Sequence, residues 1–181
     1  MSEENFDTAQ SGKPVMDRET YQTIQELFQL AREGDTPRLR EFFEMGFLAP
    51  NICDGKGNSL LMLASYNGNH ETTRLLLERG GDPEFANDMG QLPLAGAAYK
   101  GDTEMARLLI EGGANVNGQS PDGKTALMFA AMFNRIEIIE LLLEKGADAS
   151  IQTGDRATAL SLAQAMGAEA ASVRLNRQEE S

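Results

Sequence analysis

Asp122 to Ser150 reads DGKTALMFAAMFNRIEIIELLLEKGADAS, and this stretch decides the fold. Its Asp-Gly start predicts a tight turn, because glycine adopts positive φ without a Cβ clash. Thr125 is a good N-cap for a short apolar helix over Ala126–Phe133, which Asn134 interrupts. The stretch therefore begins as a turn that leads into one short helix.

A second helix is expected within the same stretch. Glu137 would lie in its first turn, where a carboxylate suits the positive end of the helix dipole. The isoleucines and leucines from Ile138 to Leu143 give it a wide apolar stripe, and Gly146 is placed to end it. Two helices this short cannot bury their own apolar faces, so the unit needs neighbours of the same shape.

Neighbours of the same shape recur along the chain at a step of 33 residues. The recurring residues are leucine and alanine inside the first helix, glycine or asparagine after it, and glycine after the second helix. They are Leu61, Leu94, Leu127 and Leu160; Ala64, Ala97, Ala130 and Ala163; Gly68, Gly101, Asn134 and Gly167; and Gly80, Gly113 and Gly146. Independent positions that share one step indicate an internal repeat.

On these residues the chain resembles the ankyrin-repeat family, whose unit of about 33 residues is a β-turn finger and two antiparallel helices. The matching residues are Thr125-Ala126-Leu127-Met128, Ala130-Ala131, Glu137 and Leu141 to Asp148. The resemblance covers roughly residues 20–175. It implies an all-α solenoid of about five helix-turn-helix repeats, with short β-turn fingers and degenerate repeats at both ends.

The pattern predicts one repeat domain over residues 18–175, between a disordered N-terminal tail at 1–17 and a C-terminal tail at 176–181. Thr20 is the expected cap of the first helix, and the last helix is expected to fray from Arg174. The expected repeats are about 20–50, 51–86, 87–119, 120–152 and 153–175.

One feature departs from the family. Its members usually open the first helix of each repeat with Thr-Pro-Leu-His, and the histidine forms hydrogen bonds between repeats. The histidine position here holds Met62, Ala95, Met128 and Ser161. We expect methionine and alanine packing to replace the missing hydrogen bonds.

Composition bounds the partners. Hydrophobic residues make up 41% of the chain and aromatic residues only 6%, which suits short helices rich in alanine and leucine. Asp and Glu number 28 against 16 Lys and Arg, which gives a formal charge of −12. Such a chain repels phosphate, so we expect neither nucleic acid nor an anionic membrane as partner. A protein with a neutral or basic surface is favoured instead.

Few groups could carry chemistry. His70 is the only histidine, and Cys53 is the only cysteine and lies beside an acidic residue, so neither a metal site nor an activated thiol is expected. Gly55-Lys56-Gly57 indicates a finger turn rather than a phosphate loop. The start lacks the basic and apolar regions of a secretory signal, and no apolar run approaches about 18 residues. We therefore expect no cofactor, no catalytic site, no membrane span, and a cytoplasmic monomer.

The resemblance implies a partner surface on the finger tips and at the ends of the first helix of each repeat. These positions hold aromatic rings and thioethers, which bury area at modest entropic cost. The candidate partner-binding residues are Tyr66, Asn67, Tyr99, Lys100, Met132, Phe133 and Met166 at the helix ends, and Lys56, Asn58, Met89, Gln91, Asp122 and Lys124 at the fingers. Together they predict an apolar and aromatic concave groove with a rim of mixed charge.

The function expected from this groove is protein–protein interaction, as a stand-alone adaptor, inhibitor or regulator. Three alternatives remain open. The rings and thioethers could simply cover the edge of a thin core, and the chain could self-associate through its Phe42-Phe43 end or through an exposed repeat face. It could also hold an unrecognised catalytic site beside His70.

Overall fold

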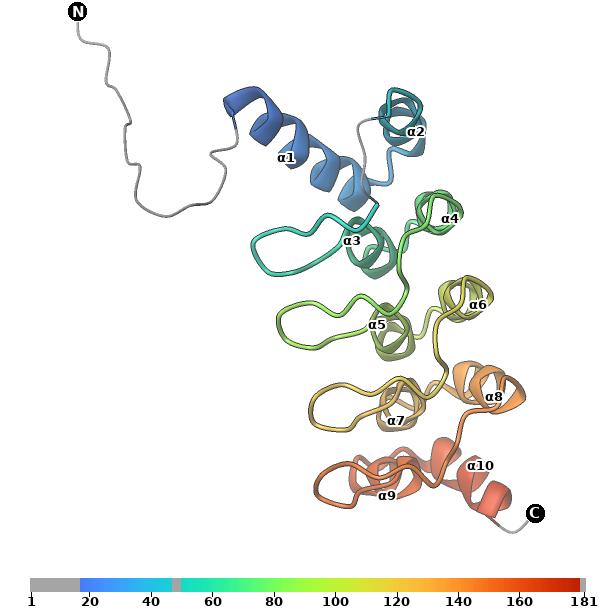
Figure 1. Ribbon diagram of the computed structural model, residues 1–181. Coiled ribbons are helices and arrows are strands. Elements are labelled where there is room, and N and C mark those ends of the chain that lie inside the picture. Colours follow the sequence, from blue (N-terminus) through green and yellow to red (C-terminus); the bar gives the residue numbers. More distant parts are fainter. Residues whose placement is uncertain (1–16, 47–49, 180–181) are drawn as a thin grey trace, which may run out of the picture.

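The computed structural model describes residues 17–46 and 50–179, which contain ten helices and no β-strand beyond isolated bridges. The helices stand in two layers (Figure 1). The inner layer consists of α1 (Arg18–Glu33), α3 (Leu60–Tyr66), α5 (Pro93–Lys100), α7 (Ala126–Met132) and α9 (Ala159–Ala165). The outer layer consists of α2 (Thr36–Glu44), α4 (His70–Glu78), α6 (Thr103–Glu111), α8 (Ile136–Glu144) and α10 (Glu169–Glu179). The expected all-α solenoid is confirmed, and its consecutive helix pairs are called repeats one to five below.

Side-chain caps start most of the inner helices. Ser59, Thr125 and Thr158 each accept a hydrogen bond from the amide three residues further on, at 3.1–3.3 Å. α5 has no side-chain cap and begins instead with Pro93, whose fixed φ suits the first helical position. Helices of seven residues, such as α3 and α7, are too short to be stable alone in water. Their stability therefore comes from stacking against one another.

The leucines that recur every 33 residues build the core. Leu61, Leu94 and Leu127 are at most 3% exposed and belong to one continuous hydrophobic cluster. Leu160 is only half-buried at the edge of this cluster, because α9 is the last inner helix. The equivalent alanines are fully buried or nearly so, which lets neighbouring inner helices approach closely.

A left-handed residue ends the inner helices of repeats two to five. Three repeats use glycine for it, with φ between 67° and 84°, at Gly68, Gly101 and Gly167. Repeat four uses Asn134 at φ 55°, and asparagine tolerates this conformation better than most side chains do. The Asn134 side chain also accepts a hydrogen bond from the Ala171 amide at 2.9 Å, so it links repeats four and five.

The two ends of the repeat array differ from the prediction. Asp17, not Thr20, caps α1, because its carboxylate accepts a hydrogen bond from the Thr20 amide at 2.8 Å. The last helix does not fray from Arg174 but continues to Glu179, beyond the boundary placed at 175. Arg174 binds Glu140 of α8 at 2.9 Å, which holds α10 against the outer layer. The predicted tails otherwise fall at 1–16 and 180–181, outside the described residues.

None of the helices within 17–46 and 50–179 combines the length and the apolar character that crossing a lipid bilayer requires. Methionine takes the place of the absent histidine in two repeats, as expected. Met62 and Met128 are 5% and 1% exposed and pack within the inner layer.

Candidate partner-binding groove

A finger precedes each inner helix from α3 to α9 (Figure 1). One short polar side chain holds each finger closed. In the first finger, Asp54 accepts hydrogen bonds from the amides of Lys56 and Asn58 at 2.9 and 3.0 Å. The residues at the same step in the later fingers are Asn87, Ser120 and Thr153. Each of them also bonds within its own finger. Short side chains that replace a backbone partner are what fix tight turns of this kind.

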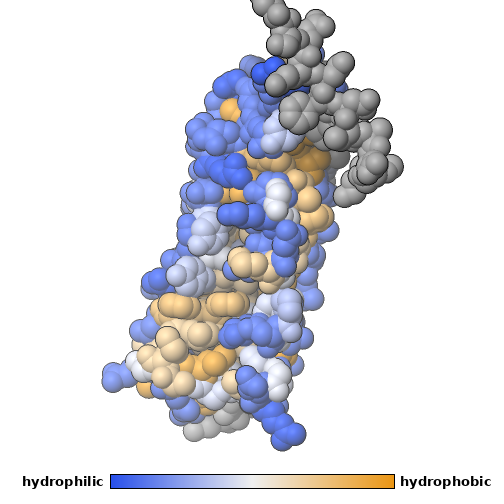
Figure 2. Space-filling view, turned by 90° about the vertical axis from the view of Figure 1, so that its left-hand side faces the viewer, coloured by the Kyte–Doolittle hydropathy of each residue, from blue (hydrophilic) through white to orange (hydrophobic). Residues whose placement is uncertain are grey.

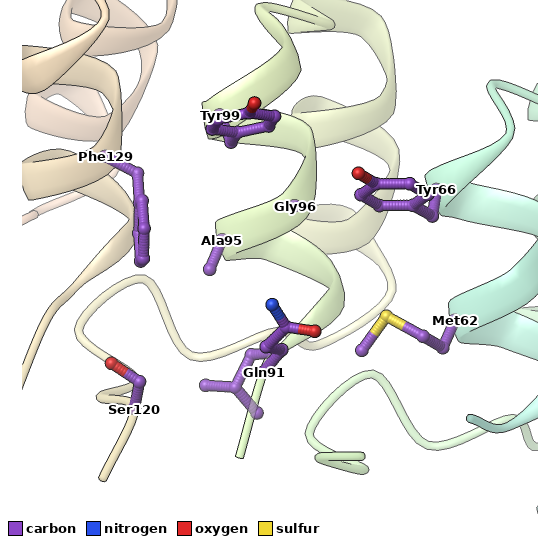
Figure 3. Close-up of a pocket in the computed structure, with 9 residues that line it drawn as sticks. Met62, Tyr66, Gln91, Ala95, Gly96, Tyr99, Ser120 and Phe129 are labelled. Carbon is purple, nitrogen blue, oxygen red and sulfur yellow. The ribbon is translucent and has the colours of Figure 1, made fainter. Parts of the chain in front are cut away.

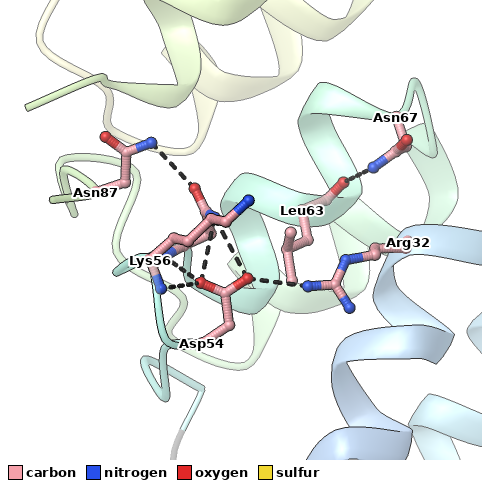
Figure 4. Close-up of polar contacts among 7 residues, drawn as sticks. Arg32, Asp54, Lys56, Leu63, Asn67 and Asn87 are labelled. Atoms are coloured by element: carbon pink, nitrogen blue, oxygen red, sulfur yellow. Dashed lines mark hydrogen bonds and ion pairs between the residues drawn. The ribbon is translucent and has the colours of Figure 1, made fainter. Parts of the chain in front are cut away.

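Neighbouring fingers are tied to each other and to α1 (Figure 4). The Asn87 side-chain amide donates to the Asn58 carbonyl oxygen at 3.0 Å, and Arg32 of α1 pairs with Asp54 at 2.9 Å. Burial acts to raise the pKa of Asp54, but the hydrogen bonds it accepts and Arg32 outweigh burial and hold that pKa below its ordinary value. The fingers are therefore preorganised, and the Asp54 carboxylate stays charged at the base of the first one.

Two adjoining pockets lie between the fingers and the inner helices, and together they are called the groove. The aromatic pocket has a volume of about 340 Å³ and is lined by Met62, Tyr66, Gln91, Leu92, Ala95, Gly96, Tyr99, Ser120 and Phe129 (Figure 3). The finger pocket has a volume of about 480 Å³ and is lined by Gly55, Lys56, Asn58, Met62, Leu63, Tyr66, Asn67, Asn87, Asp88, Met89 and Gln91. Met62, Tyr66 and Gln91 belong to both pockets, so the groove is continuous.

The structure brings part of the predicted site together in this groove. The predicted residues that line it are Lys56, Asn58, Tyr66, Asn67, Met89, Gln91 and Tyr99. Tyr66 and Tyr99 do not turn into the core: they are 47% and 43% exposed, and Met89 at the second finger tip is 69% exposed. The predicted residues outside its lining are Lys100, Asp122, Lys124, Met132, Phe133 and Met166. Their role in partner binding stays a prediction.

Two of the residues outside the lining contact the tyrosines of the groove. Phe133 is half-buried because its ring packs edge-on against Tyr99, with ring centroids 4.6 Å apart and planes at 80°. The Lys100 ammonium lies 4.2 Å from the centre of the Tyr66 ring and also donates to the Tyr66 carbonyl oxygen. Both residues fix the tyrosines in place.

The remaining predicted residues lie toward the C-terminal end. Lys124 and Asp122 form an ion pair within one finger, and hydrogen bonds from Lys124 and Ser120 lower the pKa of Asp122 to about 2. Met132 is half-buried and Met166 is 54% exposed. Figure 2 looks onto the side that carries the fingers and shows hydrophobic surface both toward this C-terminal end and toward the earlier repeats.

Sequence reasoning missed Ala95, Gly96 and Phe129, which line the aromatic pocket. Gly96 is helical rather than left-handed, and a Cβ on it would meet first the Tyr66 ring, at an ordinary distance of 3.4 Å. Glycine inside a helix costs about 1 kcal/mol relative to alanine. Nothing in the backbone therefore requires glycine here. The signal was readable, because the same steps hold the bulky residues Met62-Leu63 in repeat two and Met128-Phe129 in repeat four.

The aromatic pocket offers apolar surface and uncharged polar groups. None of the residues that line it is charged. The Gln91 side-chain oxygen accepts from Asn87 at 2.8 Å, which leaves its NH₂ group without a partner among the described residues. The geometry suits an uncharged group that also presents a hydrogen-bond acceptor.

His70 and Cys53 are the residues considered for metal binding or catalysis. His70 lies with Nε2 2.9 Å from Asp102 Oδ1, and Asp102 also caps α6 by accepting from the Met105 amide at 3.0 Å. This pair joins α4 to α6. Cys53 is exposed on the first finger. Within 17–46 and 50–179, no three His, Cys, Asp or Glu side chains come together as metal ligands would.

Comparison with known proteins agrees with this architecture. The family model described as ankyrin repeats in three copies matches residues 27–120, 61–153 and 94–175. A Pseudomonas aeruginosa protein whose name refers to ankyrin repeats is 50% identical to this chain over 65 residues. That alignment covers 36% of this chain and spans only 37% of the length of the relative. Because the family model matches most of its length, the chain belongs to the ankyrin-repeat family.

Proposed function

We propose that this chain binds another protein in its groove and acts as an adaptor, inhibitor or regulator of that partner. Ankyrin repeats are generally protein–protein interaction modules. The observation that carries the proposal is the continuous groove, with the exposed side chains of Tyr66, Met89 and Tyr99 on its walls. Tyrosine is enriched among the residues that dominate binding energy, and methionine among interface residues in general.

Rigidity of the groove supports the proposal. Hydrogen bonds close each finger, the Asn58–Asn87 contact joins two of them, and Tyr99 packs against Phe133. A surface that is already ordered loses little conformational entropy when a partner arrives. We therefore expect binding with little change in the backbone of the inner helices.

Charge favours a partner with a basic or neutral surface around the contact. The chain carries a formal charge of −12, yet the groove lining holds only one cation, Lys56, and one anion, Asp88. Long-range attraction would then come from the rest of the molecule and the close contact from apolar surface. Added salt is expected to slow association more than it speeds dissociation.

Site-specific photocrosslinking in native lysate tests the proposal. A photoreactive amino acid replaces Met89 in the groove or, as the matched control, Arg107 on the exposed side of α6. We expect one discrete protein adduct from the groove position and none from the control position. Equal adducts from both positions, or an adduct from Arg107 alone, would contradict the proposal.

A groove variant completes this test. Tyr66→Ala removes an exposed anchor and should reduce the yield of the Met89 adduct by about 30-fold, the equivalent of about 2 kcal/mol. Tyr21→Ala removes a tyrosine that is 56% exposed on α1, outside the groove, and should leave the yield unchanged. Equal loss from both variants would mean that the groove has no special role.

Self-association is one of the alternatives to partner binding. One of its two routes would use the Phe42-Phe43 end, but both rings are half-buried and the Arg79 guanidinium lies 5.4 Å from the centre of the Phe43 ring. We therefore expect a monomer by light scattering across the concentrations used for crosslinking. A dimer that dissociates on Phe42→Ala substitution would favour self-association instead.

A further inference from the structure

We infer that the partner inserts one uncharged, apolar or aromatic side chain into the aromatic pocket, and that Ala95 and Gly96 decide which side chains fit. This inference rests on the proposed function and names the chemistry that the groove accepts. The lining carries no charge, although the chain as a whole is strongly acidic. A charged side chain that entered would lose hydration without gaining an opposite charge, so the occupant is neutral.

Two small residues of repeat three line the aromatic pocket. At the same steps, repeat two places Met62-Leu63 and repeat four places Met128-Phe129. Ala95 and Gly96 add little side-chain volume to the pocket, which lies between Tyr66 of α3 on one side and Phe129 of α7 on the other, with Ala95 and Tyr99 on α5 between them (Figure 3). The helix would be more stable with alanine at position 96, and a Cβ there would lie against the Tyr66 ring at the edge of the pocket.

The polar groups at the pocket indicate an extended partner segment. Gln91 lines both pockets, and its NH₂ group is unpaired among the described residues. It can donate to a backbone carbonyl of a segment whose side chain fills the aromatic pocket. The segment would then continue over the finger pocket toward Lys56, whose ammonium has no ion pair in the described structure.

The occupant is tested first with a small probe. N-acetylphenylalaninamide is titrated into the full ¹⁵N-labelled chain, with the carboxylate-bearing N-acetylaspartamide as the matched charged probe. We expect the neutral probe to shift the amide signals of Gly96 and Phe129 with a dissociation constant on the order of 1 mM. The charged probe should leave them unmoved. Equal shifts from both probes, or shifts confined to other repeats, would overturn the inference.

Two substitutions separate the pocket from the stability of the fold. Ala95→Met installs the residue that both neighbouring repeats carry and should weaken probe binding at least about tenfold. Gly96→Ala should raise the melting temperature by about 2–4 °C while also weakening the probe. Ala165→Met adds the same side chain two repeats away and should change nothing. A Gly96→Ala variant that is stabilised but binds as the wild type does would contradict the assignment.

The Met89 crosslink separates this inference from the proposed function. If Ala95→Met abolishes the adduct while Ala165→Met retains it, the anchor pocket is supported. If the adduct forms at full yield with Ala95→Met, the anchor inference fails and the proposed function stands. If the wild-type groove gives no adduct, the proposed function fails, and probe binding alone would show a small-molecule pocket rather than a partner anchor.

Discussion

Repeats three and four share a backbone and a core but present different surfaces. Leu94 and Leu127 occupy the same buried step, at 3% and 1% exposure. The next two residues are Ala95-Gly96 in repeat three and Met128-Phe129 in repeat four. Ala95 and Gly96 line the aromatic pocket with little side-chain volume, and Phe129 lines it from the neighbouring inner helix with a large ring. The buried positions of a repeat therefore decide the fold, and the residues at its other positions are free to decide what the surface binds.

The same contrast extends to the polar groups that start the outer helices. Asp102 caps α6 in repeat three and also holds His70 of the preceding repeat. Arg135 stands at the equivalent step in repeat four, caps nothing with its side chain, and donates to the Tyr99 carbonyl oxygen at 3.4 Å. Matched substitutions in the two repeats can therefore show which features are shared and which are local.

The largest effect is expected in the shared core. Leu94→Ala and Leu127→Ala should each lower the free energy of unfolding by about 2–5 kcal/mol, because each leaves a cavity between stacked inner helices. Urea denaturation followed by circular dichroism measures both. Leu160→Ala, at a half-buried position, should cost less. A loss from Leu94→Ala below half that from Leu127→Ala would show that the two cores are not equivalent.

The outer-helix caps should separate the two repeats. Asp102→Ala removes a cap and the His70 contact and should cost about 1–2 kcal/mol of unfolding free energy. Arg135→Ala removes one long hydrogen bond from an exposed residue and should change stability by less than about 0.5 kcal/mol. The same denaturation experiment compares them. Equal losses of unfolding free energy would mean that the position within the repeat matters more than which residue occupies it.

The sequence alone was enough to predict the features that all repeats share, but not the features of single repeats. The leucine and alanine steps, and the glycine or asparagine after each inner helix, predicted the solenoid because local conformation and burial alone decide them. The C-terminal end of the array was misplaced because a distant contact decides it. The Arg174–Glu140 pair, which holds α10 on α8, joins residues far apart in the chain.

The candidate site was predictable as a region and not as a set of contacts. The helix-end positions of Tyr66 and Tyr99 indicated an exposed aromatic wall, and both rings are exposed. Sequence could not show that Phe133 lies behind Tyr99, since that depends on the spacing of two helices. The aromatic pocket is lined in part by the small residues Ala95 and Gly96. A search of the sequence for large or charged side chains overlooks such residues.

The contact between the two repeats should show a modest coupling. Tyr99→Ala, Phe133→Ala and the double variant form a thermodynamic cycle across the edge-on ring pair. We expect a coupling energy of about 0.5–1.5 kcal/mol, because aromatic pairs gain this much beyond simple burial. Tyr66 and Phe133, between which the described residues show no ring contact, provide the control cycle and should be additive. Additivity for Tyr99 and Phe133 would mean that the rings stabilise the repeats independently.

The smallest effect is the response to acidic pH, which should differ between the fingers of repeats three and four. Hydrogen bonds from Lys124 and Ser120 lower the pKa of Asp122 to about 2 in the folded chain, against an ordinary value of 3.8. A lowered folded pKa contributes stability above the unfolded value, and this contribution is lost as the pH falls through about 2. The finger of repeat three is closed by Asn87, which does not titrate. NMR signals of the Asp122 carboxyl and the Lys124 amide should therefore move together near pH 2, while the Asn87 side chain stays unchanged. Because Asp122 is 57% exposed, the effect on global unfolding should be slight. An Asp122 midpoint near its ordinary value would show that the Lys124 contact does not persist in solution.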